Sequence, residues 1–347
     1  VLTPAEALRD GAPRIHETRD SNVPFTYDYD HGEVAAGERE SDAVVEETYR
    51  LPYIAHCCLG TCGIAASFDA RGNLTLHSVT QVPFLYRRDM AAIVGIPPEK
   101  IRVIQATIGG GFGSKLDLYP YEPIAVFLAQ KAQRPVKLVF DRVEEFVSSP
   151  TRQPTEIRIR AGAKRDGTFT FRDIGFIHDN GGYTSWGATT PFVMTQTFSS
   201  LYRAPHVRMA GKVVYTNNPY AGSMRGYGNL QATFAVESSI DLMASELGID
   251  PLELRLKNTQ KAGETTGQGM IFTSCGLEDC LTTAAERAGW KEKRGVTVTD
   301  RPGVRRGIGM ASLVHVGGGA KIYKSDGCGT VRKIDDFTKV TLLTGSA

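Results

Sequence analysis

The stretch Gly109-Gly110-Gly111-Phe112-Gly113-Ser114-Lys115 constrains the fold most strongly. Three consecutive glycines leave a short piece of backbone without side chains, so it can adopt positive φ angles and expose successive N–H groups. The apolar run before it, 101–108, predicts a buried strand, and the run after it, 123–132, predicts a helix. A glycine turn between a strand and a helix suits a phosphate, a pyrophosphate or the edge of a flat cofactor. A plain tight turn is the alternative.

Three further segments help to decide between a binding loop and a plain tight turn. They are Thr80-Gln81, Thr151-Arg152-Gln153-Pro154 and Ser223-Met224-Arg225-Gly226-Tyr227-Gly228. Together with the glycine run, and in this order, they resemble the molybdopterin-binding large subunit of the xanthine dehydrogenase and aldehyde oxidase family. The resemblance extends from about Glu46 to the C-terminus. One such motif alone would be weak, but four in the right order make the resemblance specific.

Length and composition are those of a globular protein. The chain has 347 residues, of which 41% are hydrophobic and 22% charged, and its formal net charge is +2. This charge gives no general electrostatic reason to bind nucleic acid or an anionic membrane. No apolar run approaches the roughly 20 residues of a membrane span. No signal peptide is visible, and we expect a cytoplasmic protein.

Six cysteines are present, and they do not form the pattern of a disulfide scaffold. Cys57, Cys58 and Cys62 are close enough in sequence to suggest a metal or iron–sulfur site. The adjacent pair and the lack of a second CxxC argue against it. We therefore expect reduced thiols, which agrees with the family, where the iron–sulfur clusters lie on another subunit or domain.

Hydrophobic patterning predicts a mixture of strands and helices. Residues 1–45 are polar and are expected to be a linker, or the end of a preceding N-terminal domain, with one short helix near Ala5–Arg9; β signals begin at Thr48. The expected strands are 63–68, 74–80, 101–108, 136–141, 156–163, 169–178, 207–215, 307–316 and 339–344. The expected helices are 84–94, 123–132, 231–247, 251–257 and 277–288. Without a regular βαβ repeat, the pattern predicts an α+β fold. The resemblance implies that 46–347 is the first of two molybdopterin-binding domains.

The resemblance implies specific roles for residues in the four segments. The expected cofactor-binding residues are Gln81, Gly110, Gly111, Phe112, Gly113, Met224, Arg225 and Gly226, with Gln81, Phe112 and Arg225 around the molybdenum without ligating it. The expected substrate residues are Arg152, Tyr227 and Leu116. Gln81 is the expected catalytic residue because an amide donates a hydrogen bond without charge or pH dependence. Arg152 would stabilise a developing oxyanion, and Tyr227 would stack on flat substrates.

Each of these residues also has an ordinary structural interpretation. Gln81 could be a solvated cap at a strand end, and Phe112 could anchor the loop in the core. Arg225 could be a surface residue, and Arg152 could form a salt bridge. The glycine run could serve a nucleotide-binding enzyme, although it has neither Walker spacing nor a GxGxxG helix start.

Departures from the family pattern limit the substrate. Purine-oxidising members carry a glutamate where this chain has Leu116, which argues against xanthine. The carbon monoxide dehydrogenase branch carries a cysteine where this chain has Gly226, so no thiolate is present for copper. The family's general base, a glutamate near the end of the large subunit, and the second pterin-binding domain are not found in this chain. Glu122 is near the glycine loop, but a solvated or helix-cap role suits it better.

The resemblance implies an oxidoreductase that hydroxylates an aldehyde or an N-heteroaromatic carbon with water. Its cofactor would be molybdenum–molybdopterin, in the cytosine dinucleotide form or another. Electrons would pass through [2Fe-2S] clusters to FAD on partner subunits, and a further chain would carry the second domain. The alternatives are reductive dehydroxylation of an aromatic CoA thioester, as in hydroxybenzoyl-CoA reductase, and a non-catalytic scaffold subunit of an electron-transfer complex.

Overall fold

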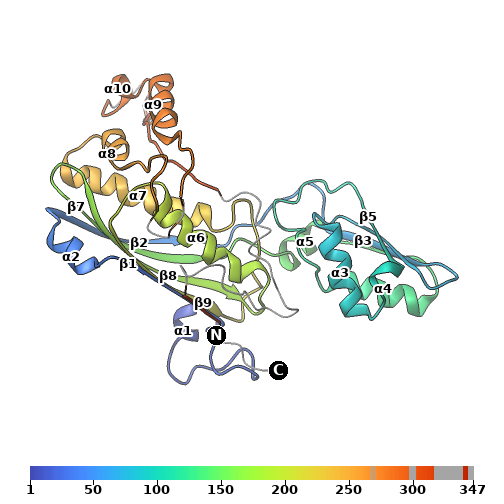
Figure 1. Ribbon diagram of the computed structural model, residues 1–347. Coiled ribbons are helices and arrows are strands. Elements are labelled where there is room, and N and C mark those ends of the chain that lie inside the picture. The colour runs from blue at the N-terminus through green and yellow to red at the C-terminus, as the bar shows by residue number, and fades with distance from the viewer. Residues whose placement is uncertain (267–268, 270, 297–301, 316–338, 343–347) are drawn as a thin grey trace.

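The computed structural model describes residues 1–266, 269, 271–296, 302–315 and 339–342 and shows an α+β protein with two sheets. The two sheets lie in two lobes that sit side by side (Figure 1). We call the lobe formed by 63–148 the small lobe and the rest of the described chain the large lobe. In the described part of the chain, no helix is both long and apolar enough to cross a membrane.

The large lobe contains a six-stranded sheet in the order β10-β1-β9-β8-β7-β2. Its strands are β1 Phe25–His31, β2 Ala43–Leu51, β7 Thr155–Ala163, β8 Phe169–Gly181, β9 His206–Tyr215 and β10 Lys339–Leu342. Its helices are α1 Pro4–Ala7, α2 Val34–Arg39, η2 Trp186–Ala188, α6 Thr189–Ser200, α7 Asn229–Leu247, α8 Pro251–Asn258, α9 Leu277–Ala288 and α10 Trp290–Lys293. Helices α6 and α7 pack together over this sheet (Figure 1). The core between them is apolar and includes Ile174, Phe198 and Val236.

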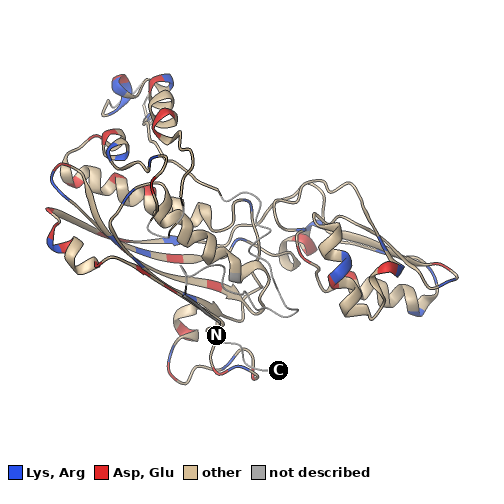
Figure 2. Cartoon of the chain, viewed as in Figure 1, with Lys and Arg blue, Asp and Glu red and all other residues tan. Residues whose placement is uncertain are grey.

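The alternation in 156–163 gives this sheet one buried and one charged face. Ile157 and Ile159 are fully buried in the core. Arg158 forms a 2.6 Å ion pair with Glu46 on the neighbouring strand, and Arg160 lies 3.4 Å from the same carboxylate. Figure 2 shows Lys, Arg, Asp and Glu interspersed along the strands of this sheet. The predicted alternation of side chains along this strand therefore places the isoleucines in the core and the arginines on the opposite, charged face.

The small lobe contains a four-stranded sheet in the order β5-β4-β3-β6. Its strands are β3 Gly63–Phe68, β4 Leu74–Ser78, β5 Ile101–Gln105 and β6 Val136–Val139. Its helices are α3 Pro83–Val94, η1 Pro98–Lys100, α4 Tyr121–Ala132 and α5 Arg142–Ser148. Strands β4 and β5 are parallel neighbours, so their carboxyl ends meet at one edge of the sheet. This edge brings Gln81, which follows β4, close to the glycine run, which follows β5.

Most of the predicted elements are confirmed, with differences of a few residues at their ends. The 164–167 turn joins β7 to β8, and Asp250 caps α8 by accepting from the Leu252 N–H at 2.8 Å. The expected strand 339–344 is confirmed over 339–342, and its last two residues lie outside the described residues. The expected strand 307–316 is wrong for 307–315, which is irregular, and Val316 lies outside the described residues.

Several elements were not expected from the sequence. Residues 25–31, within the stretch expected to be a linker, form strand β1, which pairs along its whole length with β9. This strand alternates buried Phe25 and Tyr27 with polar residues, but its aspartates suggest a turn. Helix α6 is rich in Thr and Ser and is buried on nearly all sides, so it shows neither helix propensity nor an amphipathic stripe. Helix α5 is also new and begins with a capping box at Asp141.

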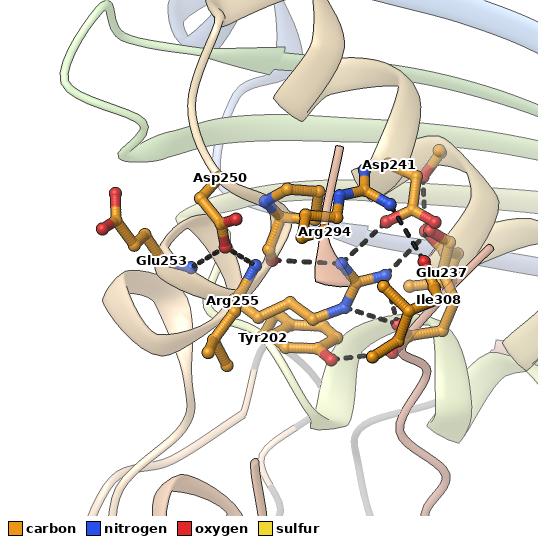
Figure 3. Close-up of polar contacts among 12 residues, drawn as sticks. Tyr202, Glu237, Asp241, Asp250, Glu253, Arg255, Arg294 and Ile308 are labelled. Carbon is orange, nitrogen blue, oxygen red and sulfur yellow. Dashed lines mark hydrogen bonds and ion pairs between the residues drawn. The ribbon is translucent and has the colours of Figure 1, made fainter. Parts of the chain in front are cut away.

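A buried ion network fixes α7 to α8 (Figure 3). The Arg255 side chain is fully buried and lies 2.7 Å from the Glu237 carboxylate and 2.8 Å from that of Asp241. It also donates to the Pro251 carbonyl at 3.1 Å, and the Tyr202 hydroxyl donates to Glu237 at 2.7 Å. Because all of these groups satisfy one another, removal of the guanidinium would leave an unpaired buried carboxylate.

We therefore expect Arg255→Ala to lower the free energy of unfolding by about 3–5 kcal/mol, the usual loss when one partner of a buried ion pair is removed. Denaturant unfolding of the purified protein measures this loss. The matched control is Arg50→Ala, which breaks an exposed pair with Glu156 and should cost far less. Equal losses for the two variants would contradict this account of the α7–α8 contact.

Candidate functional site

The glycine run forms a sharp loop at the carboxyl end of β5. Gly109, Gly110 and Gly113 have φ angles of 66°, 94° and 108°. Phe112 has a φ of 53°, which non-glycine residues rarely adopt. The predicted need for glycine is therefore confirmed at these three positions. The strain at Phe112 is of the kind that accumulates at binding sites.

The Lys115 side chain stabilises this loop from the interior of the protein. Its side chain is almost fully buried, and its ammonium group donates to the carbonyls of Gly60 at 2.7 Å, Ile108 at 2.7 Å and Gly110 at 2.9 Å. The Gly60 N–H donates in turn to the Gly109 carbonyl at 2.8 Å. A buried cation is stable here because three carbonyl dipoles replace its hydration. No sequence signal pointed to this role for Lys115.

Gln81 is tied to the glycine loop through its side-chain oxygen. Oε1 accepts from the N–H of Gly113 at 3.0 Å and from the N–H of Lys115 at 3.3 Å. Because two donors point at this atom, it must be the amide oxygen, which leaves the NH₂ group with no partner among the described residues. A Cβ at Gly111 would lie only 2.5 Å from Oε1, so a larger residue there would displace the Gln81 amide. Gln81 is therefore not a solvated cap.

The segment 223–228 packs directly against the glycine loop. The Arg225 N–H donates to the Phe112 carbonyl at 2.7 Å. A Cβ at Gly113 would lie 2.4 Å from the Ser223 carbonyl oxygen, so the two backbones touch. The same Ser223 carbonyl accepts from Nε2 of buried His56 at 2.7 Å. Two motifs that are distant in sequence thus lie side by side.

Arg152 lies beneath this surface rather than on it. Its side chain is 3% exposed and donates to the Arg225 carbonyl at 2.8 Å and to Oε1 of Gln231 at 3.0 Å. Gln231 Oε1 also accepts from the Gly228 N–H at 3.1 Å. The expectation that Arg152 faces the substrate finds no support in this geometry, because both of these hydrogen bonds position the backbone of 225–228. No salt bridge to Arg152 occurs among the described residues.

The remaining expected site residues are accessible to different degrees. Phe112 is 47% exposed, which is incompatible with an anchor in the core, and the Arg225 side chain is exposed. Met224, Gly226, Tyr227 and Leu116 are half-buried. The Tyr227 ring lies 6.3 Å from that of Trp186, measured between centroids. Trp186 carried no signal in the sequence that marked it as part of a site.

Several buried polar atoms near this surface have no hydrogen-bond partner among the described residues. They include Nε2 of Gln231, both amide atoms of Gln153, Oγ1 of Thr151 and Nδ1 of His56. Such groups are rare in native proteins and each costs about 1–3 kcal/mol. Thr151 and Gln153 flank Arg152 in the chain, and Gln231 accepts a hydrogen bond from it, so three of these residues adjoin the buried guanidinium.

The cysteines near the loop do not converge. Cys57 is exposed, whereas Cys58 and Cys62 are buried. The Cys58 thiol donates to the Gly111 carbonyl at 3.4 Å, and Cys62 lies 3.7 Å from a carboxylate oxygen of Glu145. Burial raises the pKa of the Cys62 thiol to about 12. The Cys62 thiol is therefore protonated at neutral pH.

Two carboxyls close to the loop have unusual environments. Burial raises the pKa of Glu122 to about 7, although this side chain accepts from the Tyr119 N–H at 2.8 Å and from the Ser78 hydroxyl at 3.1 Å. Glu122 caps the backbone just before α4, as expected. It is 2% exposed, so the alternative of a solvated carboxylate is wrong. Burial also raises the pKa of Asp117 to about 7, where it accepts a short hydrogen bond from the Ser185 hydroxyl.

Comparison with known proteins places this fold and surface in one family. Residues 15–259 match the family described as the molybdopterin cofactor-binding domain. The chain is 33% identical over 353 residues to a probable xanthine dehydrogenase subunit of Bacillus subtilis (strain 168), covering 99% of this chain and 45% of that protein. It is 34% identical over 289 residues to the nicotinate dehydrogenase large molybdopterin subunit of Eubacterium barkeri, covering 83% and 67%.

Solved structures agree with this assignment. The aldehyde oxidoreductase from Desulfovibrio gigas matches with a TM-score of 0.75 and 27% identity, over 85% of this chain and 33% of that chain. Quinoline 2-oxidoreductase from Pseudomonas putida 86 matches with a TM-score of 0.80 and 26% identity, over 84% and 38%. The chain therefore belongs to the molybdopterin cofactor-binding family, as the four sequence segments predicted. It spans 45% of the length of the Bacillus subtilis relative.

The raised pKa of Glu122 predicts a pH-dependent stability. A carboxyl with a higher pKa in the folded than in the unfolded protein binds its proton more tightly when folded. The free energy of unfolding should therefore fall as pH rises from about 4.5 to about 7. The contribution of this group is at most about 3 kcal/mol. Glu122→Gln should remove it and make the protein more stable than the wild type at neutral pH.

Denaturant unfolding at several pH values between 4.5 and 7 measures this difference. Glu99→Gln, at an exposed position, is the control for the loss of one negative charge. Equal pH slopes in the wild type and in Glu122→Gln would show that Glu122 is not the responsible group.

Proposed function

We propose that this chain is the molybdopterin-binding part of an oxidoreductase that hydroxylates an aldehyde or an N-heteroaromatic carbon with water. The observation that carries this proposal is the unpartnered NH₂ group of Gln81 beside a loop in which three glycines have positive φ angles. A scaffold subunit would have no use for an accessible donor and a backbone kept clear of Cβ atoms. The names of its relatives, which include xanthine, nicotinate and aldehyde enzymes, support the same class.

The residues on this surface fit a molybdenum–pterin cofactor. Gln81 would donate a neutral hydrogen bond to it, and the backbone of Gly110–Gly113 would approach it from the side of the loop next to the Gln81 amide. Phe112 and the 224–226 backbone would line the same surface. When bound, such a cofactor supplies two-electron redox chemistry and oxygen transfer from water. The protein supplies orientation and hydrogen bonds.

The proposed role of Arg152 differs from that implied by the family resemblance. Since its guanidinium holds the Arg225 carbonyl and the Gln231 amide, we assign it to positioning of the 225–228 backbone. Leu116, in place of the purine-binding glutamate, favours substrates other than xanthine.

The complete enzyme would need partners. We propose that a further stretch of chain, carrying the second molybdopterin-binding domain and the glutamate base, completes the site. An iron–sulfur subunit and a FAD subunit would take the electrons onward. The pterin would carry a nucleotide such as cytosine.

The substitution Gln81→Glu tests the role of the amide donor. It keeps an oxygen to accept from Gly113 and Lys115 but replaces the NH₂ donor with a second oxygen. Turnover of the assembled enzyme with an aldehyde or N-heteroaromatic substrate should fall about 100-fold, the usual loss when one preorganised donor is removed. Thermal stability should change little, because the loop contacts are retained.

Gln130→Glu, on the exposed side of α4, is the control for the added charge and should leave turnover unchanged. Undiminished turnover in Gln81→Glu would exclude Gln81 from the reaction. A large loss of stability in the same variant would instead indicate a purely structural role.

A further inference from the structure

Two arginines without acidic partners meet in the segment that packs on the glycine loop. Arg152 is 3% exposed, and its guanidinium donates to the Arg225 carbonyl at 2.8 Å. The Arg225 side chain is exposed, so its guanidinium is available at the surface. Among the described residues, neither guanidinium forms an ion pair with a carboxylate. Buried charges are normally paired, so a buried Arg152 without a counter-charge is unusual. Burial lowers the pKa of Arg152, but a guanidinium stays charged at neutral pH.

The positive end of helix α7 adjoins the same segment. The helix begins at Asn229, directly after 225–228, and its first turn contains no acidic residue. The N-terminus of a helix carries a partial positive charge, which nothing in this turn neutralises. Nε2 of Gln231 is a buried donor without an acceptor within the described chain, while its Oε1 accepts from Arg152 at 3.0 Å. The segment therefore has more positive charge and more donors than the described residues can match.

We propose that the substrate carries a carboxylate, that Arg225 binds this group, and that Arg152 is a positioning residue that adds a second positive charge from beneath. The inference rests on the proposed function and narrows its substrate class. The Arg225 N–H donates to the Phe112 carbonyl, so its side chain extends from the surface that also contains the Gln81 amide. A guanidinium presents a planar fork of donors that matches the two oxygens of a carboxylate.

Two probes of the same shape test the preference for negative charge. Benzoate and benzamide share a flat ring and an equal number of heavy atoms, but only benzoate is an anion at neutral pH. Calorimetric titration of the assembled enzyme should give a dissociation constant about tenfold lower for benzoate, because a charge-assisted pair replaces a neutral one. Arg225→Gln should reduce this preference to less than about twofold. Arg225→Lys, which keeps the charge but not the fork, should retain part of it.

The role of Arg152 is tested by a pair of variants that differ in charge. Both Arg152→Lys and Arg152→Gln disturb the two-point contact with Arg225 and Gln231, but only lysine keeps the positive charge. The preference for benzoate should persist in Arg152→Lys and fall in Arg152→Gln. An equal loss in the two variants would overturn the role of the Arg152 charge. Thermal unfolding shows whether each variant folds, and the Arg225 pair decides the proposal even if Arg152→Gln does not.

The control is Arg134→Gln, which removes one charge from an exposed position just after α4 and should leave the preference unchanged. Equal affinity of the wild type for the two probes, or an equal loss in Arg134→Gln and Arg225→Gln, would overturn the proposal. A preference that appears only after the molybdenum cofactor is removed would assign the arginines to an anionic part of that cofactor and would also overturn it. Because the titration needs no turnover, an enzyme purified without molybdenum would contradict the proposed function alone.

Discussion

The site depends on a single buried cation. The Lys115 ammonium group binds the carbonyls of Gly60, Ile108 and Gly110, and no acidic side chain within the described residues forms an ion pair with it. These carbonyls must turn toward Lys115, and the positive φ angles of Gly109 and Gly110 accompany this turn. A neutral side chain in place of Lys115 would leave three partly buried carbonyl acceptors without this donor. The shape of the loop is therefore stabilised from inside the protein by the Lys115 ammonium group.

The surface above this cation is assembled from both lobes by backbone contacts. Gln81 binds the loop from the small lobe, and Arg225 binds it from the large lobe through the Phe112 carbonyl. Arg152 in turn fixes the Arg225 carbonyl from beneath. Because most of these contacts involve main-chain atoms, the side chains of Phe112 and Arg225 remain available at the surface.

The sequence predicted those parts of this arrangement that depend on local pattern. Glycines with positive φ, the alternating strand β7 and the capped helix α8 all carry their signal in consecutive residues. Parts that depend on tertiary contact were missed. Helix α6 has poor propensity and no polar face because it is buried on nearly all sides, and β1 gains its place from pairing with β9. The sequence also could not show that Arg152 is buried or that Lys115 is surrounded by carbonyls, since both facts depend on distant segments.

Molybdenum content tests most directly whether the glycine loop is a cofactor cradle. The measurement is elemental analysis of the purified assembled enzyme, comparing the wild type with Gly111→Ala and with Gly276→Ala. An added Cβ at Gly111 would lie 2.5 Å from Gln81, whereas at Gly276 it would meet nothing within 4 Å. We expect near-stoichiometric molybdenum in the wild type and in Gly276→Ala, and a severe loss in Gly111→Ala. Wild-type enzyme without molybdenum, or full molybdenum in Gly111→Ala, would contradict the account.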